Sequence, residues 1–212
     1  MLDAAVAVFS ELGFHGASMD AVAARAGVSK PMVYAHGGSK DALFAACLHR
    51  EADRLVGSVT AAAAGPASGS GAGDSAEDDP RVRLRGALRA FFHAVTTRRQ
   101  GWLVLYRQAS TGPFAAEIAT LRGRIVDRAA FLLAEGVDAA PADVEPFAHT
   151  LVGAAEGLAD WWLGRGSAAA PLGGDDPADA LADMLMIVVS PGLDALRRSP
   201  SIASSSAVSD SP

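Results

Sequence analysis

Residues 18–36 read SMDAVAARAGVSKPMVYAH, and this stretch decides the fold of the N-terminal part of the chain. It predicts two short helices, each preceded by a serine, that are joined at Gly27, a residue that tolerates positive φ. Two helices cross closely when the first carries a small residue and the second an apolar one, as Ala23 and Val33 provide here. The pattern therefore predicts a helix-turn-helix whose second helix presents its N-terminal residues to the major groove of DNA.

The residues around this motif extend the helical pattern in both directions. Residues 2–12 carry apolar side chains at the spacing of one helix face, and Gly13 is expected to break that helix. Ser39 is expected to cap a further helix that runs to about Val59. Within the motif itself, Val28 is expected to add to the core.

The rest of the chain reads as helices separated by a linker. Residues 64–80 read AGPASGSGAGDSAEDDP, a composition typical of a flexible linker. Beyond it, apolar residues recur at helical spacing, and no stretch shows the alternation typical of strands. The Ser/Pro-rich residues 199–212 are expected to be disordered. The chain is therefore predicted to be all-α.

Composition and charge exclude some classes of function for this chain. Hydrophobic residues make up 50% of the 212 residues and charged residues 20%, which supports a buried core rather than a disordered chain. The net charge of −6 argues against a general nucleic-acid coat protein. Sequence-specific binding needs only a local basic patch. Between Ala21 and Lys40 the charged residues are Arg25, Lys30 and Lys40, with no acidic residue, so this stretch favours a nucleic-acid contact.

The cysteine content and the hydropathy indicate the cellular compartment of the protein. The single cysteine, Cys47, excludes an intrachain disulfide and is expected in the core. No apolar run approaches the roughly 18–20 residues that a membrane helix needs. The N-terminus lacks the basic flank and cleavage site of a signal peptide. We therefore expect a cytoplasmic protein without a membrane segment.

The last predicted helix, residues 177–198, is apolar around most of its circumference between Leu181 and Val189. Such a helix must be buried on more than one side. In a domain of this size we expect another subunit to cover the second side, whereas the alternative is a central core helix in a monomer. We therefore predict a homodimer.

Residues 2–48, LDAAVAVFSELGFHGASMDAVAARAGVSKPMVYAHGGSKDALFAACL, resemble the DNA-binding domain of the TetR family of regulators. The matching features are the LDAA opening, the S-x-D-x-V-A-x-x-A-G-V-S core, Tyr34 and the S-K-x-x-L start of the following helix. Two features differ from the family pattern. Gly37 stands where the family usually has an aromatic or apolar residue, which should loosen the junction to the next helix, and Met1 falls where the family's first helix is already under way.

The resemblance implies an all-helical homodimer that places one recognition helix in each half of a palindromic operator. It also implies a small-molecule effector, most simply one that releases a repressor from DNA. Ser29 would cap the recognition helix, and Tyr34 and Lys40 would contact phosphates. The remaining DNA-facing residues, directed at base edges or the nearby backbone, would be Lys30, Pro31, Met32 and His36.

The predicted organisation has five segments. They are a helix-turn-helix DNA-binding domain (1–48), a connecting helix (49–63), the linker (64–80), a helical ligand-sensing and dimerisation domain (81–198) and the tail (199–212).

An effector site needs an apolar cavity with a few polar groups, and no cofactor is expected. The sequence does not identify the effector, and plain core packing is the alternative for each candidate. The candidates are Phe91, Phe92, Trp102, Tyr106, Arg107, Phe114, His149, Trp161 and Trp162.

Two other functions remain open at this stage. His149, Glu156 and Asp160 share one predicted helix face and would suit a small helical enzyme or a metal site. No second helix supplies a matching set, and the sequence holds no recognised nucleophile, zinc or phosphate-binding motif, so we expect neither catalytic nor metal-ligating residues. The other alternative is a dimer of the same family that no longer binds DNA.

Overall fold

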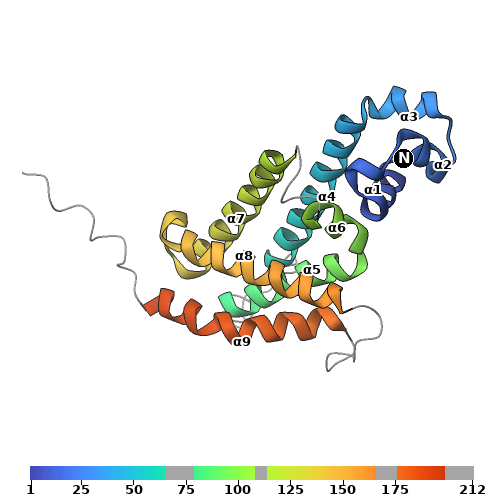
Figure 1. The fold of residues 1–212 in the computed structure, drawn as a ribbon. Helices are drawn as coiled ribbons and strands as arrows, with labels where there is room; N and C mark the ends of the chain where they lie inside the picture. The colour runs from blue at the N-terminus through green and yellow to red at the C-terminus, as the bar shows by residue number, and fades with distance from the viewer. Residues whose placement is uncertain (65–78, 108–113, 166–175, 199–212) are drawn as a thin grey trace, which may run out of the picture. The chain divides into compact units, whose positions relative to one another are not determined.

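A computed structural model describes residues 1–64, 79–107, 114–165 and 176–198 of the chain (Figure 1). All regular structure in these ranges is helical, which confirms the predicted all-α class. Of the predicted linker (64–80), residues 65–78 lie outside the described residues, as does the predicted tail at 199–212. The helices are α1 (Leu2–Gly16), α2 (Met19–Ala26), α3 (Lys30–Gly37), α4 (Lys40–Ala63), α5 (Pro80–Thr97), α6 (Arg99–Arg107), α7 (Ala115–Val137), α8 (Pro141–Gly164) and α9 (Pro177–Arg198).

The chain forms two compact units. Among the described residues, the first unit combines those of 1–57 and 94–123, and the second combines those of 58–93 with those from Arg124 onward. The first unit thus draws α6 into contact with α1, although the two helices are far apart in sequence. None of the described helices is long and apolar enough to span a membrane.

The turn between α2 and α3 follows the predicted chemistry. Ser18 caps α2, because the N–H of Ala21 donates to its Oγ over 3.1 Å. Gly27 then adopts a left-handed conformation with φ 67° and ψ 29°, and the N–H of Val28 donates to the carbonyl of Ala23. This geometry lets α3 cross close to α2 and buries Val33 completely.

One core prediction in this motif is wrong. Val28 is 37% exposed, whereas Val22 on α2 is buried. The left-handed Gly27 ends the helical register of α2, so Val28 does not continue the buried face of that helix.

Two more glycines shape the ends of the neighbouring helices. Gly13 interrupts α1 with φ 71° and ψ 170°, so the predicted break appears as a kink before Gly16. A Cβ at Gly37 would lie 3.1 Å from Cδ1 of Leu43, so Leu43 on α4 already fills the space beside this glycine. The predicted loosening of this junction stays a prediction.

Helix α4 begins after Ser39, whose Oγ accepts the N–H of Ala42 over 3.1 Å, as predicted. The helix continues to Ala63, which is also the last residue of the predicted connecting helix (49–63). Its Phe44 is fully buried and packs edge-on against Phe9, with ring centroids 4.9 Å apart. Phe14 and Phe114 complete this aromatic core, with centroids 5.1 Å and 4.7 Å from that of Phe44. Such ring pairs add stability beyond the area they bury.

Cys47 is fully buried in the core of the first unit, and desolvation raises the pKa of its thiol to about 12. The thiolate, which is the reactive form, therefore amounts to about one molecule in ten thousand at pH 8. We expect the native protein to resist dithionitrobenzoate at pH 8 and the urea-unfolded protein to react with one equivalent at once. Absorbance at 412 nm measures the release of the leaving thiolate. Fast stoichiometric labelling of the native protein would show that the thiol is accessible and ionised.

In the second unit, α5 is joined to α9 by a row of ion pairs. Arg85 Nε donates to Asp183 over 2.6 Å, Arg89 Nε lies 2.6 Å from Asp179, and Arg81 pairs with Asp194. These pairs are partly exposed, so they fix the register of the two helices more than they stabilise the fold.

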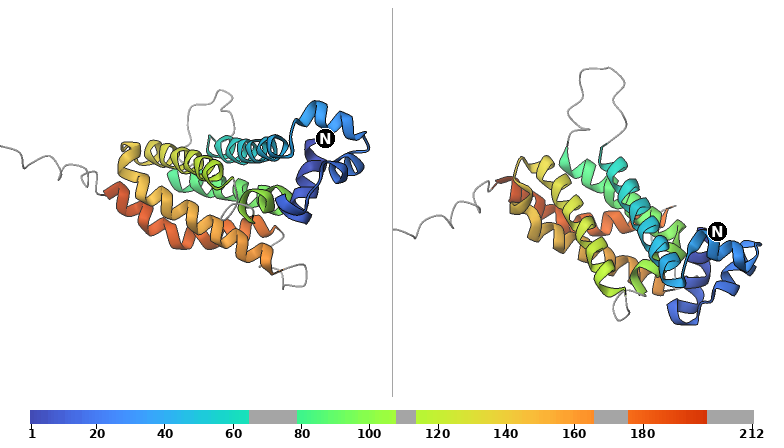
Figure 2. Two further views of the ribbon diagram at one scale, coloured as in Figure 1. Left: turned by 45° about the horizontal axis from the view of Figure 1, so that its top comes forward. Right: turned by 90° about the horizontal axis from the view of Figure 1, so that it is seen from above.

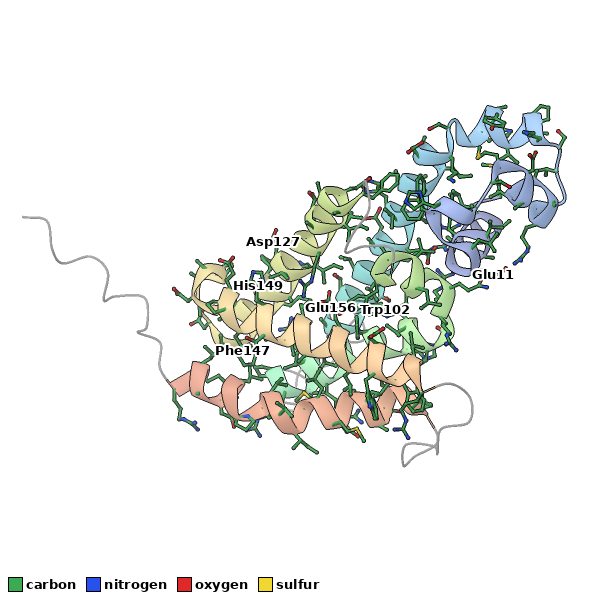
Figure 3. The ribbon with its side chains drawn as sticks, viewed as in Figure 1. Glu11, Trp102, Asp127, Phe147, His149 and Glu156 are labelled. Atoms are coloured by element: carbon green, nitrogen blue, oxygen red, sulfur yellow. The ribbon has the colours of Figure 1, made fainter. Side chains whose placement is uncertain are left out.

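Helices α8 and α9 lie side by side in the second unit (Figure 2). Phe147 on α8 points at α9, where a Cβ at Gly192 would lie 2.6 Å from Cε2 of its ring (Figure 3). The ring therefore uses the space left by the missing side chain at residue 192.

Helix α9 has two apolar faces. One face is buried in the unit and includes Leu181, Leu185 and Leu193. The other includes Ile187 and Val188, which are 77% and 72% exposed. Met184 is 41% exposed and lies one helical turn before Val188 on this second face. The sequence predicted a helix apolar on more than one side, and the structure leaves its second side uncovered.

Candidate nucleic-acid interface

The exposed surface of α3 carries most of the residues predicted to contact DNA. Met32 and Tyr34 are 47% and 48% exposed, and Pro31 and His36 are also exposed. Val33 is buried on the opposite side, where it holds α3 against the core. An exposed second helix fixed by one apolar residue is the arrangement that a recognition helix needs.

Ser29 stands at the N-cap position of α3, as predicted, but its side chain makes no capping bond. Within the described part of the chain, its hydroxyl makes no hydrogen bond to the helix. The reason lies in the next residues. Pro31 has no N–H to donate, and the N–H of Met32 donates to the backbone carbonyl of Ser29 over 3.0 Å.

Lys40 lies in a different environment from the one expected of a phosphate contact. Its ammonium donates to the carbonyls of Ala17, over 2.9 Å, and His15, over 3.3 Å, at the end of α1. It also lies 4.6 Å from the centroid of the Phe14 ring. Lys40 thus joins the start of α4 to the end of α1, and its phosphate contact stays a prediction.

Acidic side chains pair with the other two cations of the motif. Lys30 Nζ lies 2.9 Å from Asp20 Oδ2 on α2. Arg25 makes two hydrogen bonds, of 3.0 Å and 2.6 Å, to Glu11 on α1, which is labelled in Figure 3. Sequence reasoning missed these partners because Glu11 and Asp20 precede the acid-free stretch that begins at Ala21.

The predicted effector-binding residues of the first unit differ in burial, since Trp102 is buried whereas Tyr106 and Phe114 are half-buried. Trp102 is 6% exposed and stacks on Tyr106, with ring centroids 4.8 Å apart. Phe114 belongs to the aromatic core around Phe44, which favours the packing alternative for this residue. Arg107 ends α6, and its side chain lies outside the described part of the structure.

The remaining candidates belong to the second unit and do not share one environment. Phe91 and Phe92 are buried and contact each other edge-on, with centroids 5.1 Å apart. Trp161 is 45% exposed beneath the guanidinium of Arg165, whereas Trp162 is half-buried. His149 is exposed on α8. The effector site stays a prediction.

The three residues of the enzyme alternative lie along α8 but differ in exposure. Glu156 is 7% exposed, whereas His149 and Asp160 are exposed. Figure 3 labels Glu156 and His149 on this helix. Among the described residues, no cluster of three or more histidine, cysteine or acidic side chains is placed to hold a metal ion.

Taken together, α2, the Gly27 turn and the exposed α3 define a helix-turn-helix protein of the DNA-binding class. The chain belongs to the tetR family of bacterial regulatory proteins. Residues 1–47 match the family described as "Bacterial regulatory proteins, tetR family". Residues 80–188 match "Tetracyclin repressor-like, C-terminal domain". The family places the chain among transcription regulators.

Individual relatives agree with this assignment. A TetR-like transcriptional regulator from Rhodococcus sp. RHA1 shares 41% identity and a TM-score of 0.68, over 91% of this chain and 93% of that one. The HTH-type transcriptional activator FasR of Mycolicibacterium smegmatis is 40% identical over 106 residues, 50% of this chain and 43% of its own length. This match thus spans less than half of FasR.

A more distant structure shares the fold. AibR, in complex with isovaleryl coenzyme A and operator DNA, is 21% identical with a TM-score of 0.60. The likeness covers 88% of this chain and 94% of AibR.

Proposed function

We propose that this protein is a ligand-responsive transcription regulator that binds a palindromic operator as a homodimer. The observation that carries the proposal is the exposed surface of α3. Met32 and Tyr34 are exposed on this helix, while Val33 is buried and holds it against the core. Membership of the tetR family supports the DNA-binding role.

The homodimer is supported by the outer face of α9. Ile187 and Val188 are β-branched apolar residues, and both are more than two-thirds exposed. Leaving such side chains in water is unfavourable, and burying each one stabilises an interface by about 1.5–3 kcal/mol. A second copy of the same face would cover them with two-fold symmetry, which also matches a palindromic operator.

The effector would act by a population shift between two arrangements of the dimer. A ligand that binds one arrangement more tightly changes DNA affinity by the ratio of its two affinities. Isovaleryl coenzyme A is a suitable first probe, because it is the ligand found with AibR, a protein of the same fold. Release of DNA would support a repressor, whereas FasR is named an activator, so transcription in vitro with and without ligand decides the direction.

The DNA-binding role is tested with a fluorescent duplex from upstream of the protein's own gene. We expect saturable binding that exceeds binding to random DNA. The Lys30→Ala/Tyr34→Ala double variant should bind at least about 10-fold more weakly, because it loses a cationic and a phenolic contact on α3. The slope of log affinity against log salt should also fall by about one. Fluorescence anisotropy at several salt concentrations measures both quantities.

The matched control is Arg197→Ala, which removes one exposed cation from the last turn of α9. This variant should bind like the parent protein. Equal losses in both variants would mean that overall charge, and not α3, governs binding. Failure of the parent protein to bind its own and neighbouring upstream DNA would favour a family member that dimerises without binding DNA.

A further inference from the structure

The two cations of the helix-turn-helix, Arg25 and Lys30, are each paired with an acidic residue of α1 or α2. Arg25 is held by both carboxylate oxygens of Glu11, and Lys30 is held by Asp20. Lys40 is directed to backbone carbonyls at the end of α1. The basic stretch seen in the sequence is therefore not a free basic surface in the DNA-free protein.

The pair formed by Asp20 and Lys30 lies where DNA would approach. Asp20 stands in the first turn of α2, and Lys30 is the first residue of α3. Their side chains are 64% and 52% exposed, so both face solvent. The pKa of Lys30 is raised, first by its hydrogen bond to Asp20 and then by the charge of that carboxylate. The ammonium is thus protonated throughout the neutral pH range.

Besides pairing with Lys30, Asp20 has a structural role at the start of α2. A carboxylate in the first turn of a helix interacts favourably with the N-terminal helix dipole. Asp41 has the same position in α4, since both residues follow the first residue of a helix capped by a serine. A change at Asp41 therefore reproduces the loss of the dipole interaction and of one negative charge, without touching Lys30.

We propose that Asp20 is an intramolecular counter-ion that competes with DNA for Lys30 and thereby lowers the affinity of the helix-turn-helix for DNA of arbitrary sequence. Binding to arbitrary DNA depends almost entirely on cations that neutralise phosphates. Lys30 must leave Asp20 to make such a contact, and the carboxylate left behind is repelled by the phosphates. The inference rests on the proposed function, and it assigns to Asp20 a role in specificity.

The test measures binding to a random-sequence duplex at about 50 mM salt by fluorescence anisotropy. We expect Asp20→Asn to bind about 2- to 5-fold more tightly than the parent, the range typical of removing one exposed ion pair. Asp41→Asn should change affinity by less than about 1.5-fold. In a Lys30→Gln background, the gain from Asp20→Asn should shrink to that of Asp41→Asn, because no ammonium is left to release.

Each outcome separates the two proposals. Equal gains from Asp20→Asn and Asp41→Asn, or an undiminished gain in the Lys30→Gln background, would overturn the counter-ion role and leave the regulator role intact. Absence of binding by the parent protein to both random and upstream DNA would overturn both. Circular dichroism melts of every variant establish that the compared proteins are equally folded.

Discussion

The Ile187→Asp/Val188→Asp double variant is expected to be a monomer at concentrations where the parent protein is a dimer. Both residues lie on the outer face of α9, with 77% and 72% of their surface exposed. Burial of each side chain contributes about 1.5–3 kcal/mol, and a two-fold interface repeats each substitution on both subunits. The dissociation constant of the dimer should therefore rise by more than about 100-fold. Sedimentation velocity over a concentration series measures this shift.

Val82→Asp is the matched control for the dimer prediction. Val82 is an apolar residue on α5 that is 54% exposed, so the substitution adds one negative charge per subunit, half the change in the double variant, at another exposed apolar position. This variant should keep the oligomeric state of the parent. Because the buried face of α9 is unchanged in the double variant, its helical circular dichroism should persist. A folded double variant that still sediments as a dimer would place the interface elsewhere.

Local chemistry explains which parts of the fold could be predicted from the sequence. Ser18, Gly27 and Ser39 act on backbone groups within a few residues of themselves, and the structure confirms all three. The absence of a side-chain capping bond at Ser29 was also predictable in principle. Pro31, two residues later, lacks an N–H, which removes one of the two donors that a capping side chain can use.

Interactions between distant residues explain what the sequence did not reveal. The partners of Lys30 and Arg25 come from α2 and α1, so a count of charges within one stretch overstated the basic patch. The aromatic residues proposed for an effector site were chosen by residue type and helical spacing. Helical spacing predicts that such residues are buried, and it does not predict which of them face one cavity.

The burial of Glu51 among arginines is the clearest example of a feature that the sequence does not indicate. It is 6% exposed in the first unit, and the guanidinium groups of Arg50 and Arg54 donate to its Oε1, each over 3.0 Å. Arg98 lies 3.6 Å from Oε2. Nothing in the residues around position 51 indicates that an arginine almost fifty residues away completes this cluster. A buried carboxylate of this kind depends on all of its partners.

Gly101 on α6 makes room for this carboxylate. An ideal Cβ at Gly101 would lie 2.5 Å from Oε2 of Glu51, closer than real Cβ contacts allow. The side chain of Glu51 is held by its arginines, so it can move away only by breaking those ion pairs. A glycine at this position of α6 is therefore a requirement of the buried charge cluster.

Gly101→Ala is expected to lower the free energy of unfolding by about 1–3 kcal/mol, the usual effect of overpacking. This change in the free energy of unfolding is opposite in sign to the usual one, because alanine in place of glycine inside a helix normally stabilises by about 1 kcal/mol. Gly123→Ala on α7 is the control, since a Cβ there would meet no atom within 4 Å, and it should show the usual stabilisation. Urea unfolding followed by circular dichroism at constant pH measures all of these values.

The effect of Gly101→Ala should change sign when Glu51 is shortened. Glu51→Ala alone should destabilise by about 1–3 kcal/mol, because it leaves the arginines without their buried partner, and the exposure of Arg54 and Arg98 limits this loss. In that background the clash is absent, so Gly101→Ala should stabilise by up to about 1 kcal/mol. The two substitutions would then be coupled strongly, as expected of residues in contact. Additive effects would mean that the close approach of Gly101 to Glu51 does not constrain the native state.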